Sequence, residues 1–242
     1  MQLSVRPSIS VFFPCYNDKG TIGSLVIDAK GVLDKLTDEY EIIVIDDGST
    51  DGSRDFLREL QSQYQMLRLV FHDHNRGYGA AIQSGIAAAT KDLVFYTDGD
   101  GQYDVKELPL LYAALTDDID IVNGFKIKRN DPWYRLIIGK IYHFFVSLMF
   151  GLKIRDVDCD FRLMRRKIFD VVKLESHTGT VCVELVKRIQ DAGFRFAEVG
   201  VSHYHRIYGQ SQFFNFPRVA RSLWQLAGLW VNIVVKKKRS GQ

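Results

Sequence analysis

The sequence predicts an α/β fold, in which a mainly parallel sheet is covered by helices on both faces. Short apolar runs typical of buried strands alternate with segments of 3.6-residue periodicity up to about residue 122. The apolar runs are ISVFF (9–13), EIIVID (41–46), LRLVF (67–71), DLVFY (92–96) and IDIV (119–122). The periodic segments are 21–36, 52–64, 78–89 and 105–116. Strands that alternate with helices in this way are the pattern of a parallel sheet.

The composition is that of one folded domain. Of the 242 residues, 46% are hydrophobic, which is ample material for a core. The 32 Lys and Arg residues nearly balance the 29 Asp and Glu residues, and this balance argues against a nucleic-acid partner. Three scattered cysteines, Cys15, Cys159 and Cys182, have no paired spacing and are typical of reduced thiols. We therefore expect a cytoplasmic protein.

The second half of the chain has a different character. A basic, turn-prone segment, NGFKIKRNDPWYR, precedes a helix expected at 136–152, and DVDCDFRLMRR follows it. A run of charge, Arg162, Arg165, Arg166 and Lys167, is expected to form a solvated face, and only Arg162 has motif support. A helix near 180–191 and a strand at 194–206 come next, before an apolar helix at 216–235. We expect one domain over residues 1–215, with 216–242 as a C-terminal amphipathic helix and basic tail.

Two segments could contact a membrane, although none can span one. No apolar run approaches the roughly 20 residues that cross a bilayer, and the N-terminal run comes too late for a signal peptide. Residues 133–152 and 216–239 both combine aromatic residues with Lys or Arg. Packing on the sheet explains the first segment equally well. For the second, Trp224, Trp230 and the closing KKKR favour a helix in the membrane interface.

Carboxylates gather where the fourth strand ends. The stretch FYTDGDGQYD (95–104) places Asp98, Asp100 and Asp104 within seven residues, and like charges this close repel unless a cation compensates them. An EF-hand calcium loop is excluded, because the twelfth position counted from Asp98 is Pro109 rather than glutamate. Asp104 suits a helix cap. The remaining D-x-D pair can hold a divalent cation that neutralises a diphosphate.

Other strand ends carry similar polar turns. PCYND follows the first run, DDGSTDGS the second, and NRGYGAAIQSG opens the third helix. No G-x-G-x-x-G follows the first strand, which removes the main support for a dinucleotide-dependent oxidoreductase. Each turn alone is explained about as well by capping. Together, at successive strand ends, they indicate one ligand-binding edge. His72 and His74 are interpreted as ordinary loop residues.

These motifs resemble those of a known family. FFPCYND, IDDGSTDGS, NRGYGAAIQSG and TDGDGQYD, in this order, resemble the family 2 inverting glycosyltransferases, whose GT-A fold is Rossmann-like. The second half resembles the dolichol-phosphate mannose synthases and related polyprenyl-phosphate glycosyltransferases. The stretches that carry this second resemblance are NGFKIKR, WYRLIIGK, DVDCDFRLMRR and EVGVSHYHRIYGQSQF. The resemblance covers about residues 8 to 215.

The resemblance implies roles for individual residues. A nucleotide-diphosphate sugar would be bound by Pro14, Tyr16, Asp18, Asp47, Asp98 and Gln102, with Asp47 facing the base. Asp100 and Gln102 would hold Mg²⁺ or Mn²⁺. The acceptor phosphate would meet Lys126, Arg135, Arg206 and Ser211. Asp98, Asp100 and Arg206 would be the catalytic residues.

Some positions depart from the pattern of the family. Asp18 stands where the family often has Glu, and Gly139 replaces a polar residue. Lys126 stands where Arg is common, and lysine lacks the guanidinium group that can bind a phosphate through two hydrogen bonds. The aspartates of DVDCD, which are Asp156, Asp158 and Asp160, are candidates to orient arginines or sugar hydroxyls, and none is assigned as a base.

The implied function is metal-dependent, inverting transfer of a sugar from GDP-mannose or a UDP-hexose to a polyprenyl or dolichyl phosphate. An ionised phosphate acceptor requires cations rather than a general base, and the sequence offers basic residues but no unambiguous base. Transfer to a sugar hydroxyl, or nucleotide-sugar binding without catalysis, are the alternatives. Many relatives have added transmembrane helices. We therefore expect this protein to lie peripherally on the cytoplasmic face of a membrane, or to use a membrane partner subunit.

Overall fold

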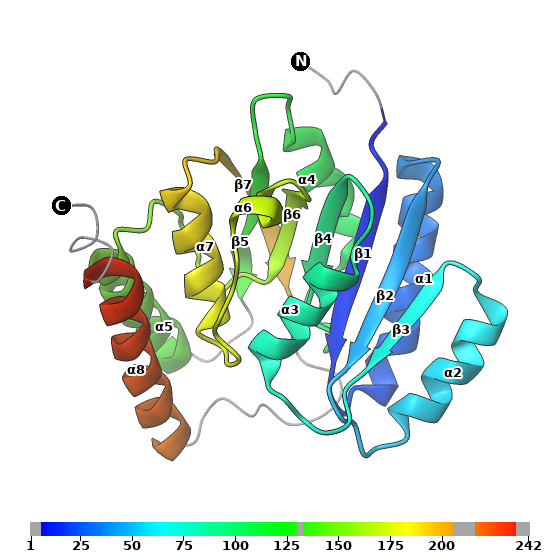
Figure 1. The fold of residues 1–242 in the computed structure, drawn as a ribbon, viewed down its shortest axis with the longest axis horizontal. Helices are drawn as coiled ribbons and strands as arrows, with labels where there is room; N and C mark the ends of the chain where they lie inside the picture. The colour runs from blue at the N-terminus through cyan, green and yellow to red at the C-terminus, as the bar shows by residue number, and fades with distance from the viewer. Residues whose placement is uncertain (1–5, 130–132, 206–215, 236–242) are drawn as a thin grey trace.

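The structure, a computed structural model, describes residues 6–129, 133–205 and 216–235. Its centre is a seven-stranded sheet with helices on both faces (Figure 1), which confirms the predicted fold class. The strands are β1 (Ile9–Cys15), β2 (Tyr40–Asp46), β3 (Leu67–Phe71), β4 (Leu93–Thr97), β5 (Ile121–Arg129), β6 (Phe161–Arg165) and β7 (Phe196–His203). The α-helices are α1 (Lys19–Leu36), α2 (Ser53–Gln63), α3 (Tyr78–Ala88), α4 (Leu108–Ala114), α5 (Trp133–Phe150), α6 (Ile168–Val171), α7 (Val181–Asp191) and α8 (Phe216–Trp230). A 3₁₀ turn, η1 (Val105–Glu107), precedes α4, and a π-helical turn, η2 (Val231–Val235), follows α8.

The order of the strands is β3-β2-β1-β4-β6-β5-β7. All pairs are parallel except those of β6, which runs antiparallel to both β4 and β5. Continuous apolar strands such as β1 suit a sheet that is buried on both faces. Helices α1, α2 and α4 cover one face, while α3, α6 and α7 cover the other.

Two sequence interpretations were wrong. The NGFKIKR stretch is not a turn-prone segment, because β5 continues to Arg129 and pairs along its length with β7. In the run of charge, Arg166 and Lys167 are exposed as expected, but Arg162 and Arg165 belong to the mostly buried strand β6. Pairing on both sides satisfies its backbone, and alternate side chains such as Leu163 and Met164 pack into opposite faces of the sheet.

The C-terminal helix packs against the rest of the domain. Side chains of α5, α7 and α8–η2 form a third apolar cluster, which includes Val146, Val183, Leu226, Leu229 and Ile233. The indole N–H of Trp230 donates a hydrogen bond to the carbonyl of Met149 (2.8 Å). Helix α8 therefore shares a hydrophobic core with α5 and α7.

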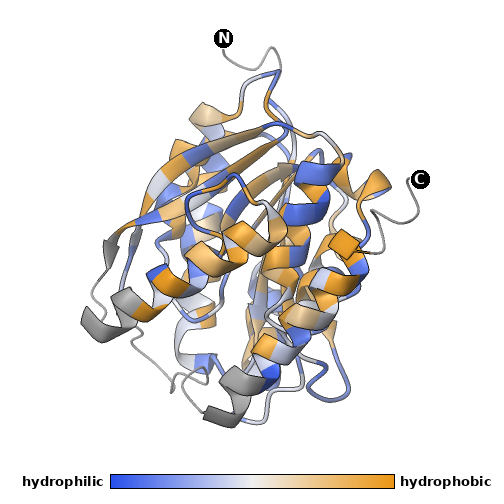
Figure 2. Cartoon of the chain, turned by 90° about the vertical axis from the view of Figure 1, so that its left-hand side faces the viewer, coloured by the Kyte–Doolittle hydropathy of each residue, from blue (hydrophilic) through white to orange (hydrophobic). Residues whose placement is uncertain are grey.

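Both α5 and α8 carry a row of exposed apolar side chains, here named the α5–α8 face. Hydrophobic positions recur along both helices in Figure 2, and the two helices lie side by side in Figure 1. The face consists of Ile138, Ile141, Phe144, Phe145, Leu148, Met149, Leu223, Trp224 and Val231. Within the described ranges, none of the helices has the length and apolar character needed to cross a bilayer.

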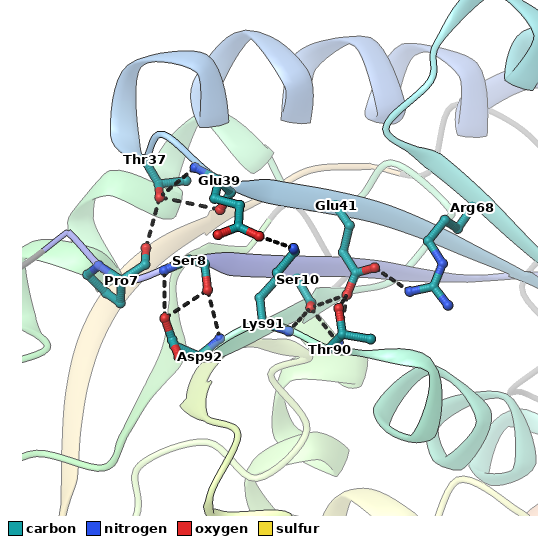
Figure 3. Close-up of polar contacts among 10 residues, drawn as sticks. All are labelled: Pro7, Ser8, Ser10, Thr37, Glu39, Glu41, Arg68, Thr90, Lys91 and Asp92. Atoms are coloured by element: carbon teal, nitrogen blue, oxygen red, sulfur yellow. Dashed lines mark hydrogen bonds and ion pairs between the residues drawn. The ribbon is translucent and has the colours of Figure 1, made fainter.

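At the amino-terminal edge of the sheet, a buried carboxylate joins three segments (Figure 3). Glu41 accepts hydrogen bonds from Ser10 Oγ (2.6 Å) and from the backbone N–H of Thr90 (2.7 Å), and it pairs with Arg68. Burial alone would raise the pKa of Glu41, but these hydrogen bonds outweigh burial and hold the pKa below its usual range. The carboxylate thus fixes β1 and β2 against the turn between α3 and β4.

We predict that Glu41→Gln destabilises the fold by about 1.5–3 kcal/mol at neutral pH, because an amide cannot accept all of these hydrogen bonds. A carboxyl whose pKa is lowered by folding stabilises the protein above its unfolded-state pKa, and that stabilisation is lost as the pH falls through the folded-state pKa. The difference between wild type and variant should therefore shrink below the ordinary glutamate pKa of about 4.3. Urea unfolding at several pH values measures this difference.

Glu39→Gln is the matched control, since Glu39 is a more exposed carboxylate that pairs with Lys91 in the same region (Figure 3). An exposed ion pair contributes about 0–1 kcal/mol. Equal losses in the two variants, or a loss at Glu41 that is independent of pH, would contradict the role given to Glu41.

Candidate active site at the carboxyl edge of the sheet

The loops that follow β1 and β2 are joined into one surface. The backbone N–H of Asn17 donates to Ser49 Oγ (3.0 Å), and Asn17 Oδ1 accepts from the backbone N–H of Thr50 (2.8 Å). The φ of Asn17 is 58°, in the left-handed region that asparagine adopts more readily than most residues. This conformation turns the loop back towards β2.

The residues expected to line a nucleotide on the β1 side lie on this surface. Tyr16 is exposed, and its backbone N–H donates to the carboxylate of Asp18 (3.2 Å). The carbonyl oxygen of Pro14 would lie only 2.4 Å from a Cβ placed on Gly99, so glycine is required between the two D-x-D aspartates. The end of β1 and the D-x-D turn are therefore in direct contact.

The D-x-D carboxylates are held in an enclosed turn. The hydroxyl of Tyr78 donates to Asp98 Oδ1 (2.6 Å), and Asp100, which is 5% exposed, accepts from the backbone N–H of Gln102 (3.0 Å). Burial and the neighbouring carboxylates of Asp160 and Asp100 raise the pKa of Asp98 well above its usual range, although the Tyr78 hydroxyl acts in the opposite direction. This site therefore concentrates negative charge that a cation would stabilise.

A second group of carboxylates lies on the loop before β6, and it surrounds Lys126. The ammonium group of Lys126 donates to the carbonyl of Asp158 (2.7 Å) and lies 3.9 Å from Asp156 Oδ2. Burial raises the pKa of Asp158 to about 7, while Lys126 partly opposes this rise. Lys126, expected to meet an acceptor phosphate, therefore already has one anionic neighbour.

Arg162 fixes the shape of this loop from below. Its side chain is completely buried and donates to the carbonyls of Cys159 (3.1 Å) and Val157 (2.5 Å). The guanidinium also lies 3.7 Å from Asp160 Oδ1, which in turn accepts from the hydroxyl of Tyr96 (3.1 Å). Arg162 had been grouped with a solvated run of charge, but it is the cation at the base of the acidic loop.

Asp47 organises the loop between β3 and α3. Its carboxylate is 3% exposed and pairs with His72 Nδ1 (2.6 Å). It also accepts from the backbone N–H groups of Arg76 (2.8 Å) and Gly77 (2.9 Å). The roles of His72 and Tyr78, which contact Asp47 and Asp98, were not predicted from the sequence. The only sequence signal for Tyr78 was an aromatic residue inside the G-x-G segment.

The remaining predicted residues lie at the border of the described structure. Gln102 is tied to the segment after β7, since its side-chain N–H donates to the carbonyl of Tyr204 (3.1 Å) and its own carbonyl accepts from the N–H of Tyr204 (2.8 Å). Arg206 and Ser211 lie outside the described residues, and only the backbone of Arg135 is described, as part of α5.

The donor set fits a divalent cation. In the described part of the chain, no three His, Cys, Asp or Glu side chains are grouped to hold a metal ion. Magnesium and manganese sites that serve nucleotides commonly use only one or two protein carboxylates, with substrate phosphates supplying the other oxygens. Asp100 and its neighbour Asp98 meet this requirement, and a cation would offset the effect of burial and of the neighbouring carboxylates, which together raise the pKa of Asp98.

A family model described as Glycosyl transferase family 2 matches residues 10–172. The chain belongs to this family. It is also 32% identical over 207 residues to an undecaprenyl-phosphate 4-deoxy-4-formamido-L-arabinose transferase of Aeromonas hydrophila. The match covers 85% of this chain and 62% of that protein, so the chain spans about three-fifths of this relative's length. The resemblance found in the sequence is confirmed.

Solved structures with a similar fold are known. One is glucosyl-3-phosphoglycerate synthase of Mycobacterium tuberculosis with Mn²⁺, UDP and glucosyl-3-phosphoglycerate, at a TM-score of 0.65 and 21% identity. The match covers 84% of this chain and 73% of that one. The same synthase with phosphoglyceric acid gives a TM-score of 0.70 at 20% identity, over 93% of this chain and 79% of that one. At this level of identity, the likeness shows the fold.

We predict that Arg162→Met destabilises the protein by about 3–5 kcal/mol, because it leaves Asp160 without its buried cation and two carbonyls without a donor. Urea unfolding measures the loss. Arg166→Met is the control, since Arg166 is exposed just after the same strand and should change stability by less than about 0.5 kcal/mol. Similar losses in both variants would contradict a special role for Arg162.

Proposed function

We propose that this protein is an inverting glycosyltransferase, which moves a sugar from a nucleotide-diphosphate sugar to a polyprenyl phosphate with the help of Mg²⁺ or Mn²⁺. The observation that carries the proposal is the enclosed D-x-D turn at the end of β4, in a chain of family 2. The relative of 32% identity is named as a transferase to undecaprenyl phosphate, which supports the acceptor class.

The donor would bind across the loops of β1, β2 and β4. Tyr16 is exposed beside the carboxylate of Asp18, where a nucleotide could contact both. Asp98, held by the Tyr78 hydroxyl, would meet the ribose. A cation on Asp100 and Gln102 Oε1 would offset the charge that develops on the leaving diphosphate. The contact between the Gln102 N–H and Tyr204 directs the amide so that its oxygen is the atom left for a metal.

The acceptor would bind on the side of β5. Lys126 is mostly buried there. Arg135 and Arg206 complete the basic group that the family pattern places around a lipid phosphate, and Ser211 belongs to the G-x-S turn after Arg206. Because Asp156 lies 3.9 Å from Lys126, a phosphate would have to compete with this carboxylate for the ammonium group. Arg135 and Arg206 would therefore contribute most of the attraction.

Transfer to a sugar hydroxyl is the second candidate, and one observation favours it. A hydroxyl acceptor requires a base with a pKa near the operating pH. Burial raises the pKa of Asp158 to about 7, beside the same Lys126. A lipid phosphate would have no need of such a group.

We also propose that the α5–α8 face rests on the cytoplasmic surface of a membrane. Phe144, Leu148 and Trp224 are 63%, 70% and 80% exposed, and an apolar area of this kind is typical of an interaction surface. Trp230 was expected at headgroup depth, but it packs against α5 instead. The basic residues Lys236 to Arg239 lie outside the described residues. No observation in the described structure supports a membrane partner subunit.

We predict that Asp100→Asn lowers transfer from the nucleotide sugar to polyprenyl phosphate by about 100-fold or more, because it removes charge that would bind the cation. The measurement is transfer of labelled sugar from GDP- and UDP-sugars in the presence of Mn²⁺, with and without a chelator. Asp104→Asn is the matched control, since Asp104 belongs to the same loop but caps η1 by accepting from the Lys106 N–H (2.9 Å). It should retain activity within a few fold.

Three outcomes would contradict parts of this proposal. If a chelator leaves the wild-type activity unchanged, transfer does not depend on a metal ion. Transfer to a sugar alcohol but not to polyprenyl phosphate would favour the second candidate. Tight binding of a nucleotide sugar with no transfer to any acceptor would indicate a binding protein.

We predict that the triple variant Phe144→Ser, Leu148→Ser, Trp224→Ser loses at least about tenfold in binding to vesicles that contain anionic lipid. Each large apolar side chain that enters the interface contributes up to about 1.5–3 kcal/mol. Co-sedimentation measures binding, and the nucleotide affinity of the variant should not change. Leu110→Ser is the control, because Leu110 is an exposed leucine on α4, outside this face. Equal binding of the triple variant and wild type would contradict the membrane role.

A further inference from the structure

Glu184, on α7, is a completely buried carboxylate that the proposed function does not use. It accepts hydrogen bonds from the backbone N–H groups of Glu175 (3.1 Å) and Ser176 (2.8 Å). Arg188, one turn later on α7, donates its Nε–H to Glu184 (2.7 Å). A buried charge is costly unless it is paired and hydrogen-bonded, and these three donors meet that requirement. Glu184 therefore holds residues 172–180, here named the α6–α7 loop, against α7.

The other side of the α6–α7 loop is bonded to the first turns of α3. The carbonyl of His177 accepts from the backbone N–H of Gly79 (3.0 Å). The carbonyl of Ser176 accepts from the side-chain amide of Gln83 (2.9 Å). A Cβ at Gly79 would lie 2.1 Å from the Ser176 oxygen, and one at Gly77 would meet the His177 oxygen at 2.4 Å. The two glycines of the G-x-G segment therefore allow the loop to approach, because a side chain at either position would collide with its backbone.

The start of α3 also reaches the D-x-D turn. Tyr78 lies between the two glycines, and its hydroxyl donates to Asp98 Oδ1 (2.6 Å). The backbone N–H of Gly77 donates to Asp47 Oδ2 (2.9 Å). A shift of the start of α3 would therefore displace donors to carboxylates that follow two different strands, β4 and β2.

Packing on the sheet fixes α3 less sharply than these hydrogen bonds do. The side chains of Ala81 and Ile82 are buried in the core on this face, and Gly85 lies against the ring of Phe12. Apolar contact is non-directional, whereas a hydrogen bond weakens steeply as its angle changes. The α6–α7 loop thus supplies directional contacts that set the position of the start of α3.

We propose that Glu184 is a positioning residue for the donor site. It holds the α6–α7 loop, the loop fixes the start of α3, and the hydroxyl of Tyr78 then orients Asp98. The inference rests on the proposed function, in which Asp98 meets the ribose of the donor. Because Glu184 has no exposed surface, it cannot touch a substrate and acts only through this series of contacts.

Four variants test the separate links. An amide has a single acceptor oxygen, so Glu184→Gln cannot keep all three donors. Gln83→Met separates the loop from α3 at a partly buried contact and leaves Glu184 with its donors, so it tests the inference even if Glu184→Gln does not fold. Tyr78→Phe removes only the hydroxyl that meets Asp98. Glu175→Gln is the matched control, because Glu175 is an exposed carboxylate that pairs with the same Arg188 (3.1 Å).

The experiment titrates each variant with UDP and GDP in the presence of Mn²⁺ and measures its urea unfolding in parallel. For the nucleotide that wild type binds more tightly, Glu184→Gln should raise the dissociation constant at least about tenfold and Gln83→Met about threefold, because small misplacements of a site are costly. Glu175→Gln should stay within about twofold. Tyr78→Phe should also weaken binding. Adding Glu184→Gln to Tyr78→Phe should cost less than about twofold more, because residues that act through one another are not additive.

The outcomes distinguish this inference from the proposed function. If Glu184→Gln is less stable but binds the nucleotide as wild type does, Glu184 only stabilises the fold, and the inference is overturned while the glycosyltransferase proposal stands. Wild-type affinity in Gln83→Met, additive losses in the double variant, or an equal loss in Glu175→Gln would likewise overturn it. If wild type binds neither UDP nor GDP with Mn²⁺, both proposals are overturned together.

Discussion

The crowding of negative charge at one edge of the sheet is the constraint on which the site depends. Five aspartates, from the D-x-D turn and the loop before β6, face two enclosed cations, Lys126 and Arg162. Burial is the main cause of the raised pKa of Asp98 and of Asp158, neighbouring carboxylates add to it, and Lys126 opposes it only in part. Hydrogen-bond donors to Asp98, Asp100, Asp156 and Asp160 stabilise this arrangement, and a further cation would stabilise it more.

The direction of one strand brings the two acidic groups together. Because β6 runs antiparallel between β4 and β5, its first residue, Phe161, pairs with Thr97, the last residue of β4. The loop that enters β6 therefore lies beside the loop that leaves β4. A parallel strand in this place would have put residues 156–160 at the opposite edge of the sheet. The antiparallel insertion is thus the feature that brings the D-x-D turn next to the loop before β6.

The sequence predicted the parts of the structure in which local pattern and tertiary role agree. Strands β1, β2 and β4 are nearly continuous apolar runs, and the polar turns that follow them could be assigned to one edge of a sheet from strand polarity alone. The strand β6 was missed because Arg162 and Arg165 interrupt its apolar pattern. Their guanidinium groups are satisfied by carbonyls more than two residues away, and local pattern cannot show this.

Residues that act through another residue were also beyond the reach of the sequence. His72 and Tyr78 each hold an aspartate that the motifs had identified, at sequence separations of 25 and 20 residues. Neither lies at a conspicuous spacing, since the partners meet only after β2, β3 and β4 have paired. Roles for Asp47 and Asp98 could therefore be predicted from the sequence, but the side chains that orient these two carboxylates could not. Both of these contacts depend on α3, which supplies Tyr78 directly and fixes His72 through Ser84.

The position of the α5–α8 face has a consequence for how substrates would reach the site. Figure 1 places α5 and α8 beyond the β7 end of the sheet, whereas β3 and α2 form the opposite end. A bilayer held against α5 and α8 would lie next to the strand that carries Lys126, and it would leave the loops after β1, β2 and β3 open to water. A lipid acceptor could then arrive by lateral diffusion within the membrane, while a charged nucleotide enters and its product leaves through solution. The two substrates would not share an entrance, and the protein could remain on the same membrane through successive turnovers.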